Sequence, residues 1–122
     1  MDSELFGSFE MPGGSIAVLQ EAAGCVMYLS GDVDAPVIKQ WETEQDSAVV
    51  TVVAVDVGEL AYIDSTGLSF LVRWAQQARR DGRPPVLLRT TSRFEKVLDL
   101  AGLTSLFVMD GGSQTFGRPS SL

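Results

Sequence analysis

An apolar run that ends in a short polar turn and leads into a helical pattern limits the folds open to this chain most strongly. Residues 48–57 are mostly valine and alanine, which is typical of a central strand covered on both faces. The sequence Asp-Ser-Thr-Gly follows at 64–67, here called the Asp64–Gly67 turn, and residues 68–80 repeat apolar side chains at helical spacing. This order predicts that a serine hydroxyl lies at a helix N-terminus, where backbone N–H groups lack intrahelical partners.

The Asp64–Gly67 turn also has purely structural uses. Asp64 and Ser65 can each cap a helix by accepting a hydrogen bond from an amide of its first turn. Gly67 permits a tight turn or a close approach of two backbones. Spacing alone therefore favours a helix cap, and a functional role needs support from other parts of the chain.

The rest of the chain alternates between strand and helix patterns. The elements expected around the central strand are strands at 15–22 and 24–30, a short helix from Asp34, a main helix at 65–80, a strand at 86–89, a helix from Ser92 and a strand at 105–109. The order β-β-α-β-α-β-α-β predicts an α/β fold with a mixed, mostly parallel sheet covered by helices. Residues 58–62 are expected to form a loop before the Asp64–Gly67 turn.

The two ends of the chain show little periodicity. Residues 1–14 contain three glycines and a proline, and they predict a flexible N-terminal lead-in. Residues 111–122 are rich in glycine and serine and predict a flexible C-terminal tail. A single domain is therefore expected over residues 15–110.

Composition narrows the classes of function. A net charge of −7 at pH 7 argues against direct binding of nucleic acid, which needs a basic surface. The sequence has no histidine, so it cannot build a Ser-His-Asp relay, and it is poor in metal ligands. The single Cys25 predicts a buried structural thiol in a reducing compartment. We expect a cytoplasmic protein without enzyme activity, cofactor, metal or contact with a membrane.

Three segments together resemble the STAS domain, and more narrowly the bacterial anti-sigma factor antagonists. The Asp64–Gly67 turn with Leu68 resembles the family signature, and residues 31–34 (Gly-Asp-Val-Asp) resemble a strand end that usually reads Gly-Glu-Leu-Asp. Residues 93–107 resemble the last helix and strand of the family. The resemblance spans about residues 15–110 and implies the STAS fold.

The resemblance also implies a function. Ser65 corresponds to the phosphorylated serine, and Thr66 is a second candidate acceptor. The unphosphorylated protein would bind an anti-sigma factor and free a sigma factor for transcription. The same anti-sigma factor commonly acts as the serine kinase, and a separate phosphatase resets the switch. Phosphate would add negative charge to the desolvated contact and weaken it, while the free protein would be a monomer or weak dimer.

The expected partner-binding residues gather around the Asp64–Gly67 turn. They are Asp32, Asp34, Asp64, Ser65, Thr66, Gly67, Phe70 and Trp74. Asp34 can equally cap the helix that it precedes. Phe70 and Trp74 lie one helical turn apart and off the core-facing stripe, where aromatic side chains can either pack at a helix edge or anchor an interface.

Two other interpretations remain open from the sequence. A receiver-like protein would accept phosphate on Asp56, near the end of the central strand. A STAS domain can alternatively serve as a scaffold or accessory subunit of a larger signalling or lipid-transport complex. Ser65 does not exclude the accessory subunit, but the phosphoacceptor serine, the free-standing length and the lack of an apolar run long enough to span a membrane favour the antagonist.

Overall fold

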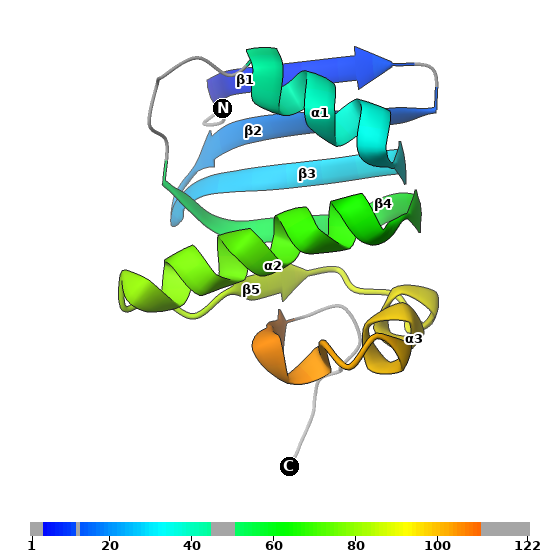
Figure 1. The fold of residues 1–122 in the computed structure, drawn as a ribbon. Coiled ribbons are helices and arrows are strands. Elements are labelled where there is room, and N and C mark those ends of the chain that lie inside the picture. The colour runs from blue at the N-terminus through cyan, green and yellow to red at the C-terminus, as the bar shows by residue number, and fades with distance from the viewer. Residues whose placement is uncertain (1–3, 12, 45–50, 111–122) are drawn as a thin grey trace.

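The computed structural model describes residues 4–11, 13–44 and 51–110, which form one sheet with helices packed against it (Figure 1). The strands are β1 (Glu4–Met11), β2 (Gly14–Glu21), β3 (Gly24–Val33), β4 (Val52–Ile63), β5 (Val86–Leu88) and β6 (Val108–Asp110). The helices are α1 (Ala35–Glu44), α2 (Ser65–Arg80), α3 (Ser92–Leu100) and the short 3-10 helix η1 (Thr104–Leu106).

The strands lie in the sheet in the same order as in the sequence, from β1 to β6. The pairs β1–β2 and β2–β3 are antiparallel, whereas β3–β4, β4–β5 and β5–β6 are parallel. A helix connects each parallel pair, and Figure 1 shows α1 and α2 against the same face of the sheet. The predicted α/β fold with a mixed, mostly parallel sheet is therefore confirmed.

The prediction of a flexible lead-in over residues 1–14 is wrong for β1. This strand pairs with β2 along its length, from Glu4 opposite Gln20 to Met11 opposite Gly14. Gly13 has a φ of 100° in the connecting turn, a conformation that glycine adopts without steric cost. Hydrogen bonds to the edge of β2 stabilise the strand despite its weak local pattern. Residues 1–3 and the predicted tail at 111–122 lie outside the described residues.

The predicted loop at residues 58–62 is also wrong, because β4 continues through it to Ile63. The parallel register with β3 runs on from Ser30 opposite Glu59 to Val33 opposite Ile63, with irregularities between Tyr28 and Ser30 and between Gly31 and Asp32. The backbone hydrogen bonds to β3 maintain an extended conformation where the local sequence is not strand-like. The Asp64–Gly67 turn consequently begins directly at the end of a strand.

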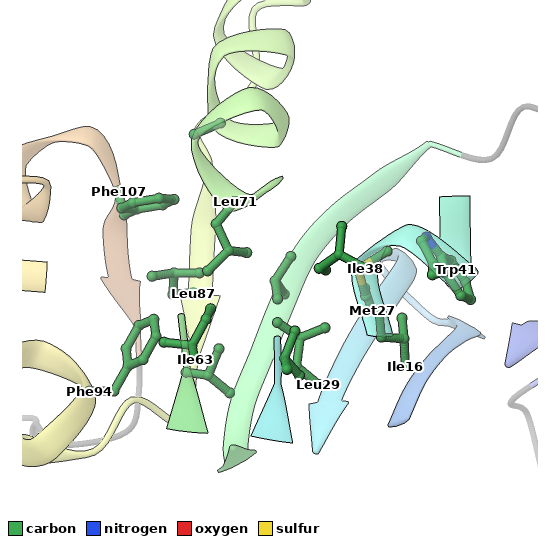
Figure 2. Close-up of a cluster of buried hydrophobic side chains, with 14 of the residues drawn as sticks. Ile16, Met27, Leu29, Ile38, Trp41, Ile63, Leu71, Leu87, Phe94 and Phe107 are labelled. Atoms are coloured by element: carbon green, nitrogen blue, oxygen red, sulfur yellow. The ribbon is translucent and has the colours of Figure 1, made fainter. Parts of the chain in front are cut away.

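The main core lies between the sheet and the helices (Figure 2). Its strand residues include Ile16, Val18, Met27, Leu29, Val55, Val57 and Leu87, and its helix residues include Ile38, Trp41, Leu71, Ala75 and Leu98. The predicted stripe on the main helix is confirmed at Leu71, Ala75 and Ala78, each fully buried. Cys25 is buried and free, as expected for a structural thiol.

Candidate functional site

The carboxyl ends of β3 and β4 lie side by side. They bring residues 31–34 and the Asp64–Gly67 turn together. Asp32 is opposite Tyr62, Val33 is opposite Ile63, and the amide of Asp64 donates to the carbonyl of Val33 at 3.4 Å. Helices α1 and α2 begin immediately after these strand ends. This edge of a parallel pair is where open α/β sheets place binding sites.

Asp64 connects the N-termini of both helices through one carboxylate. Its Oδ1 accepts a hydrogen bond from the amide of Gly67 in α2 at 2.9 Å. Its Oδ2 accepts one from the amide of Ala35, the first residue of α1, at 3.0 Å. Asp34 makes a single cap, because its Oδ1 accepts only from the amide of Val37 among the described residues, at 3.4 Å. Both predicted caps are therefore present, and Asp64 caps two helices.

The phosphoacceptor candidates occupy the first turn of α2. Ser65 is the first residue of the helix and is exposed, while Thr66 is partly buried. The first amides of a helix and its dipole favour an anion at this position. A phosphate on Ser65 would therefore be compatible with α2 itself.

Gly67 allows α2 to approach the ends of β3 and β4 closely. It is buried, and a Cβ atom at this position would lie 2.5 Å from Cγ1 of Ile63 and 2.8 Å from the carbonyl oxygen of Val33. No larger residue can occupy the position without displacing backbone. Gly67 thus has a structural role beneath the candidate phosphorylation site.

The acidic segment at the end of β3 is held by the turn between β1 and β2. The amide of Asp32 donates to the carbonyl of Gly13, and the Asp32 side chain is exposed. Gly31 has a φ of 67°, and a Cβ atom there would collide with the Gly13 carbonyl. The turn that joins β1 to β2 therefore helps to position Asp32, one of the expected partner-binding residues.

Phe70 and Trp74 do not form a free surface. Both are partly buried and pack against the core, and the indole Nε1 of Trp74 donates to the carbonyl of Val52 at 3.1 Å. Packing at the helix edge accounts for their position. Their role in partner binding stays a prediction.

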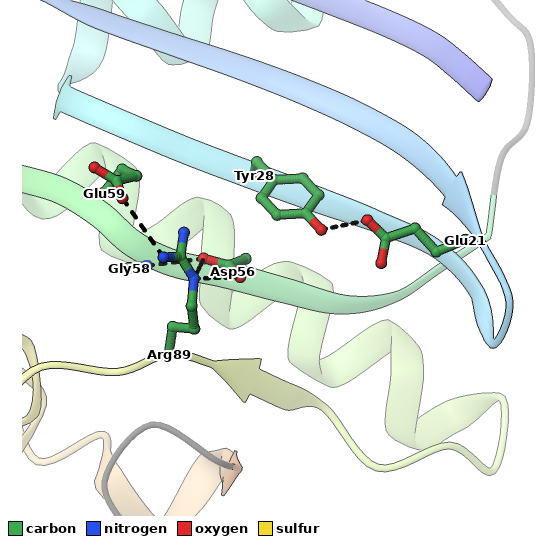
Figure 3. Close-up of polar contacts among 6 residues, drawn as sticks. All are labelled: Glu21, Tyr28, Asp56, Gly58, Glu59 and Arg89. Atoms are coloured by element: carbon green, nitrogen blue, oxygen red, sulfur yellow. Dashed lines mark hydrogen bonds and ion pairs between the residues drawn. The ribbon is translucent and has the colours of Figure 1, made fainter. Parts of the chain in front are cut away.

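The opposite face of the sheet carries a polar cluster that the sequence analysis did not find (Figure 3). Asp56 is only 5% exposed, and Nε of Arg89 lies 3.1 and 3.0 Å from its two carboxylate oxygens. The amide of Gly58 donates to Asp56 at 2.9 Å, and Arg89 also lies 3.5 Å from Glu59. The hydrogen bond from Arg89 to Asp56 is the largest cause that raises the pKa of the guanidinium above the ordinary value for arginine.

Asp56 is poorly placed to accept phosphate in the receiver-like interpretation. Its carboxylate is buried, and both oxygens are already bonded to Arg89. Arg89 adopts a φ of 55°, which is unusual for a residue other than glycine and turns the side chain back across Gly58. An aspartate within an apolar run and an arginine at the end of the next strand were the only signals of this pair in the sequence.

Tyr28 lies on the same face of the sheet as Asp56 and Arg89, and its pKa is raised (Figure 3). Its hydroxyl donates to Glu21, and this hydrogen bond is the largest cause that raises the pKa of Tyr28 to about 12. The folded state favours the neutral phenol over the tyrosinate, because the pKa of Tyr28 is about 12 in the folded protein and 10.0 in a free tyrosine. This preference stabilises the folded protein in full below pH ~10, and the stabilisation is lost as the pH rises towards 12. We expect Glu21→Gln to lower this pKa, measured from tyrosinate absorbance, with Tyr28→Phe identifying the signal. An unchanged pKa in Glu21→Gln would contradict the assignment.

The described part of the chain has neither a cluster of metal-binding side chains nor a membrane-spanning helix. Residues 4–11, 13–44 and 51–110 contain no group of three or more histidine, cysteine, aspartate or glutamate side chains that could hold a metal ion. The helices of the same residues are all too short or too polar to cross a membrane.

The comparison with protein families agrees with the fold. The family described as "Mlab, STAS domain" matches residues 16–109. The chain therefore belongs to the STAS domain family. A search of curated proteins found no match.

Proposed function

We propose that this chain is an anti-sigma factor antagonist that is switched off by phosphorylation of Ser65. In this role it is a cytoplasmic binding protein and not an enzyme. Its unphosphorylated form binds an anti-sigma factor with serine kinase activity, and a protein phosphatase restores that form. The observation that carries the proposal is the exposed Ser65 hydroxyl at the first position of α2, beside the ends of β3 and β4.

The local charges support a switch that acts on the partner. The carboxylates of Asp34 and Asp64 are engaged with backbone amides beside Ser65, and Asp32 is exposed nearby at the end of β3. A phosphate would add about −1.5 to −2 charges to this acidic edge. Because α2 can accommodate an anion at its N-terminus, the fold would persist while a desolvated contact with the partner would weaken.

The test compares the wild type with Ser65→Glu for capture of proteins from a lysate of the native host. We expect the wild type to retain an anti-sigma factor of the kinase class, and Ser65→Glu to bind it at least ~10-fold more weakly, which corresponds to about 1.4 kcal/mol. Incubation of the captured kinase with ATP should then phosphorylate the wild type at Ser65 but leave Ser65→Ala unmodified. Mass spectrometry identifies both the partner and the modified residue.

Ser105→Glu is the matched control, because Ser105 is an exposed serine on η1, away from the Asp64–Gly67 turn. It adds the same charge and should leave capture unchanged. Circular dichroism should show that all variants are folded. Equal capture by Ser65→Glu and the wild type, together with no phosphate on Ser65, would contradict the proposal.

A second candidate is a STAS subunit of a larger signalling or lipid-transport complex that has no phosphorylation switch. The family description favours keeping this candidate, because it names Mlab and is not confined to antagonists. In that case the wild type and Ser65→Glu should capture the same complex, and no sigma-factor regulator should be present in it.

A further inference from the structure

A groove of about 520 Å³ crosses the face of the sheet that carries Tyr28, which is the face opposite to α1 and α2 (Figure 3). The apolar residues of its lining come from three adjacent strands and include Val26, Ala54, Val86 and Leu88. Strand alternation directs these side chains away from the main core, to which their neighbours Val55 and Leu87 belong. Because Val86 and Leu88 are partly exposed, the groove presents apolar surface that α1 and α2 do not cover.

The charges along the rim of the groove are mainly negative. Glu21 lies at the β2–β3 end and Asp110 at the β6 end, and neither forms an ion pair with another described residue. Arg83 is the one cation of the lining, and it is already paired with Asp81 at 3.0 Å. Glu21 accepts a hydrogen bond from the neutral hydroxyl of Tyr28, which leaves its charge in place. The groove is therefore suited to an apolar segment that carries a positive charge.

Residues 111–122, which lie outside the described residues, follow Asp110 directly and have this chemistry. Gly111 and Gly112 come first, and glycine allows the chain to reverse its direction at the end of β6. Phe116 is the only aromatic residue of the segment, and Arg118 is its only charged residue. The segment therefore begins at one end of the groove and carries one apolar anchor and one cation.

The segment is also long enough to cross the groove. From β6 to β3 the sheet has three strand spacings, a distance of about 15 Å. Phe116 follows Asp110 by six positions, and six residues span up to about 20 Å when extended. Arg118 lies two positions further along, so it can reach Glu21 at the far end of the groove.

We propose that residues 111–122 of the same chain occupy this groove, with Phe116 against Val26 and Val86 and with Arg118 beside Glu21. A tethered segment needs little affinity of its own, because a short linker gives it a high effective concentration at the groove. The contact covers apolar surface of the sheet that other proteins would otherwise meet. The inference does not rest on the proposed function, since it uses neither the phosphoacceptor serine nor the turn that carries it.

The first test observes the contact directly by NMR of the purified full chain. We expect nuclear Overhauser effects between the ring protons of Phe116 and the methyl groups of Val26 and Val86 in a uniformly labelled sample. An isotope-filtered mixture of labelled and unlabelled protein identifies contacts between molecules, and these effects should be absent from it. If they are missing from the uniform sample, or arise only between molecules, the proposal is overturned.

The second test measures chymotrypsin cleavage after Phe116. The full chain should be cleaved there at least ~10-fold more slowly than a synthetic peptide of residues 111–122, because cleavage requires the seated segment to open. Equal rates for the full chain and the peptide would overturn the inference.

A pair of variants links this protection to the groove. Ala23→Trp places a large side chain into the groove from the exposed β2–β3 turn, and Ala101→Trp makes the same change at an exposed alanine that does not line it. We expect Ala23→Trp to be cleaved after Phe116 nearly as fast as the peptide, and Ala101→Trp to be cleaved as slowly as the wild type. Circular dichroism should show that both variants are folded. Slow cleavage of folded Ala23→Trp would show that the groove does not hold the segment.

Discussion

Asp64→Ala is expected to lower the free energy of unfolding by about 2–3 kcal/mol, because it removes the caps of two helices at once. Each cap of this kind contributes ~1 kcal/mol or more. The amides of Gly67 and Ala35 would both lose the carboxylate that accepts their hydrogen bonds at present. Urea denaturation followed by circular dichroism measures the loss.

Asparagine at the same position separates the double cap from an ordinary one. At a single cap, asparagine and aspartate are nearly equivalent. At Asp64, however, the amide group of asparagine would direct its NH₂ towards either Gly67 or Ala35, so one backbone donor would face another donor. We therefore expect Asp64→Asn to cost about 1–3 kcal/mol, the usual cost of an unsatisfied partly buried donor.

Asp34→Asn is the matched control, because Asp34 accepts from one backbone amide, that of Val37. An asparagine oxygen can replace that acceptor, so the loss should stay below about 1 kcal/mol. Equal losses for Asp64→Asn and Asp34→Asn would show that the bridge between α1 and α2 does not contribute to stability.

The parts of the site that could be predicted from the sequence are those that depend on neighbouring residues. The amide that caps α2 belongs to Gly67, three residues after Asp64, and the buried stripe of α2 follows from helical spacing. The second bond of Asp64 could not be predicted in this way, because Ala35 is 29 positions away in the sequence. It depends on the parallel register of β3 and β4, which no local pattern specifies.

The same distinction explains the two corrected strand predictions. Residues 4–11 and 58–62 have weak strand patterns of their own and become strands by pairing with β2 and β3. Pairing energy depends on cross-strand neighbours rather than on intrinsic preference. The Asp56–Arg89 pair is likewise formed by residues 33 positions apart, in strands whose register had to be known first.

Arg89→Ala is expected to lower the free energy of unfolding by about 2–3 kcal/mol, because it leaves the carboxylate of Asp56 buried without a cation. Loss of one partner from a fully buried ion pair costs ~3–5 kcal/mol. Asp56 is 5% exposed, but the Arg89 side chain is 52% exposed, so water can partly replace the guanidinium. The expected loss is therefore smaller than for a fully buried pair. Chemical denaturation near neutral pH measures the difference.

A companion variant separates the charge of Arg89 from its backbone strain. Arg89 has a φ of 55°, which glycine adopts more easily than alanine by ~1 kcal/mol. Arg89→Gly should therefore be more stable than Arg89→Ala by about that amount, although both lack the cation. Equal stabilities would indicate that the backbone at this position relaxes once the side chain is removed.

The double variant Asp56→Asn/Arg89→Ala tests whether the loss comes from the unpaired charge. Asparagine keeps an oxygen that can accept from the amide of Gly58 but carries no charge, so the double variant should regain most of the stability lost in Arg89→Ala. The Arg89 side chain also packs against Gly58. A Cβ atom added to Gly58 would lie 2.5 Å from Cζ of Arg89. A double variant no more stable than Arg89→Ala would show that this packing, and not the charge, is the contribution of Arg89.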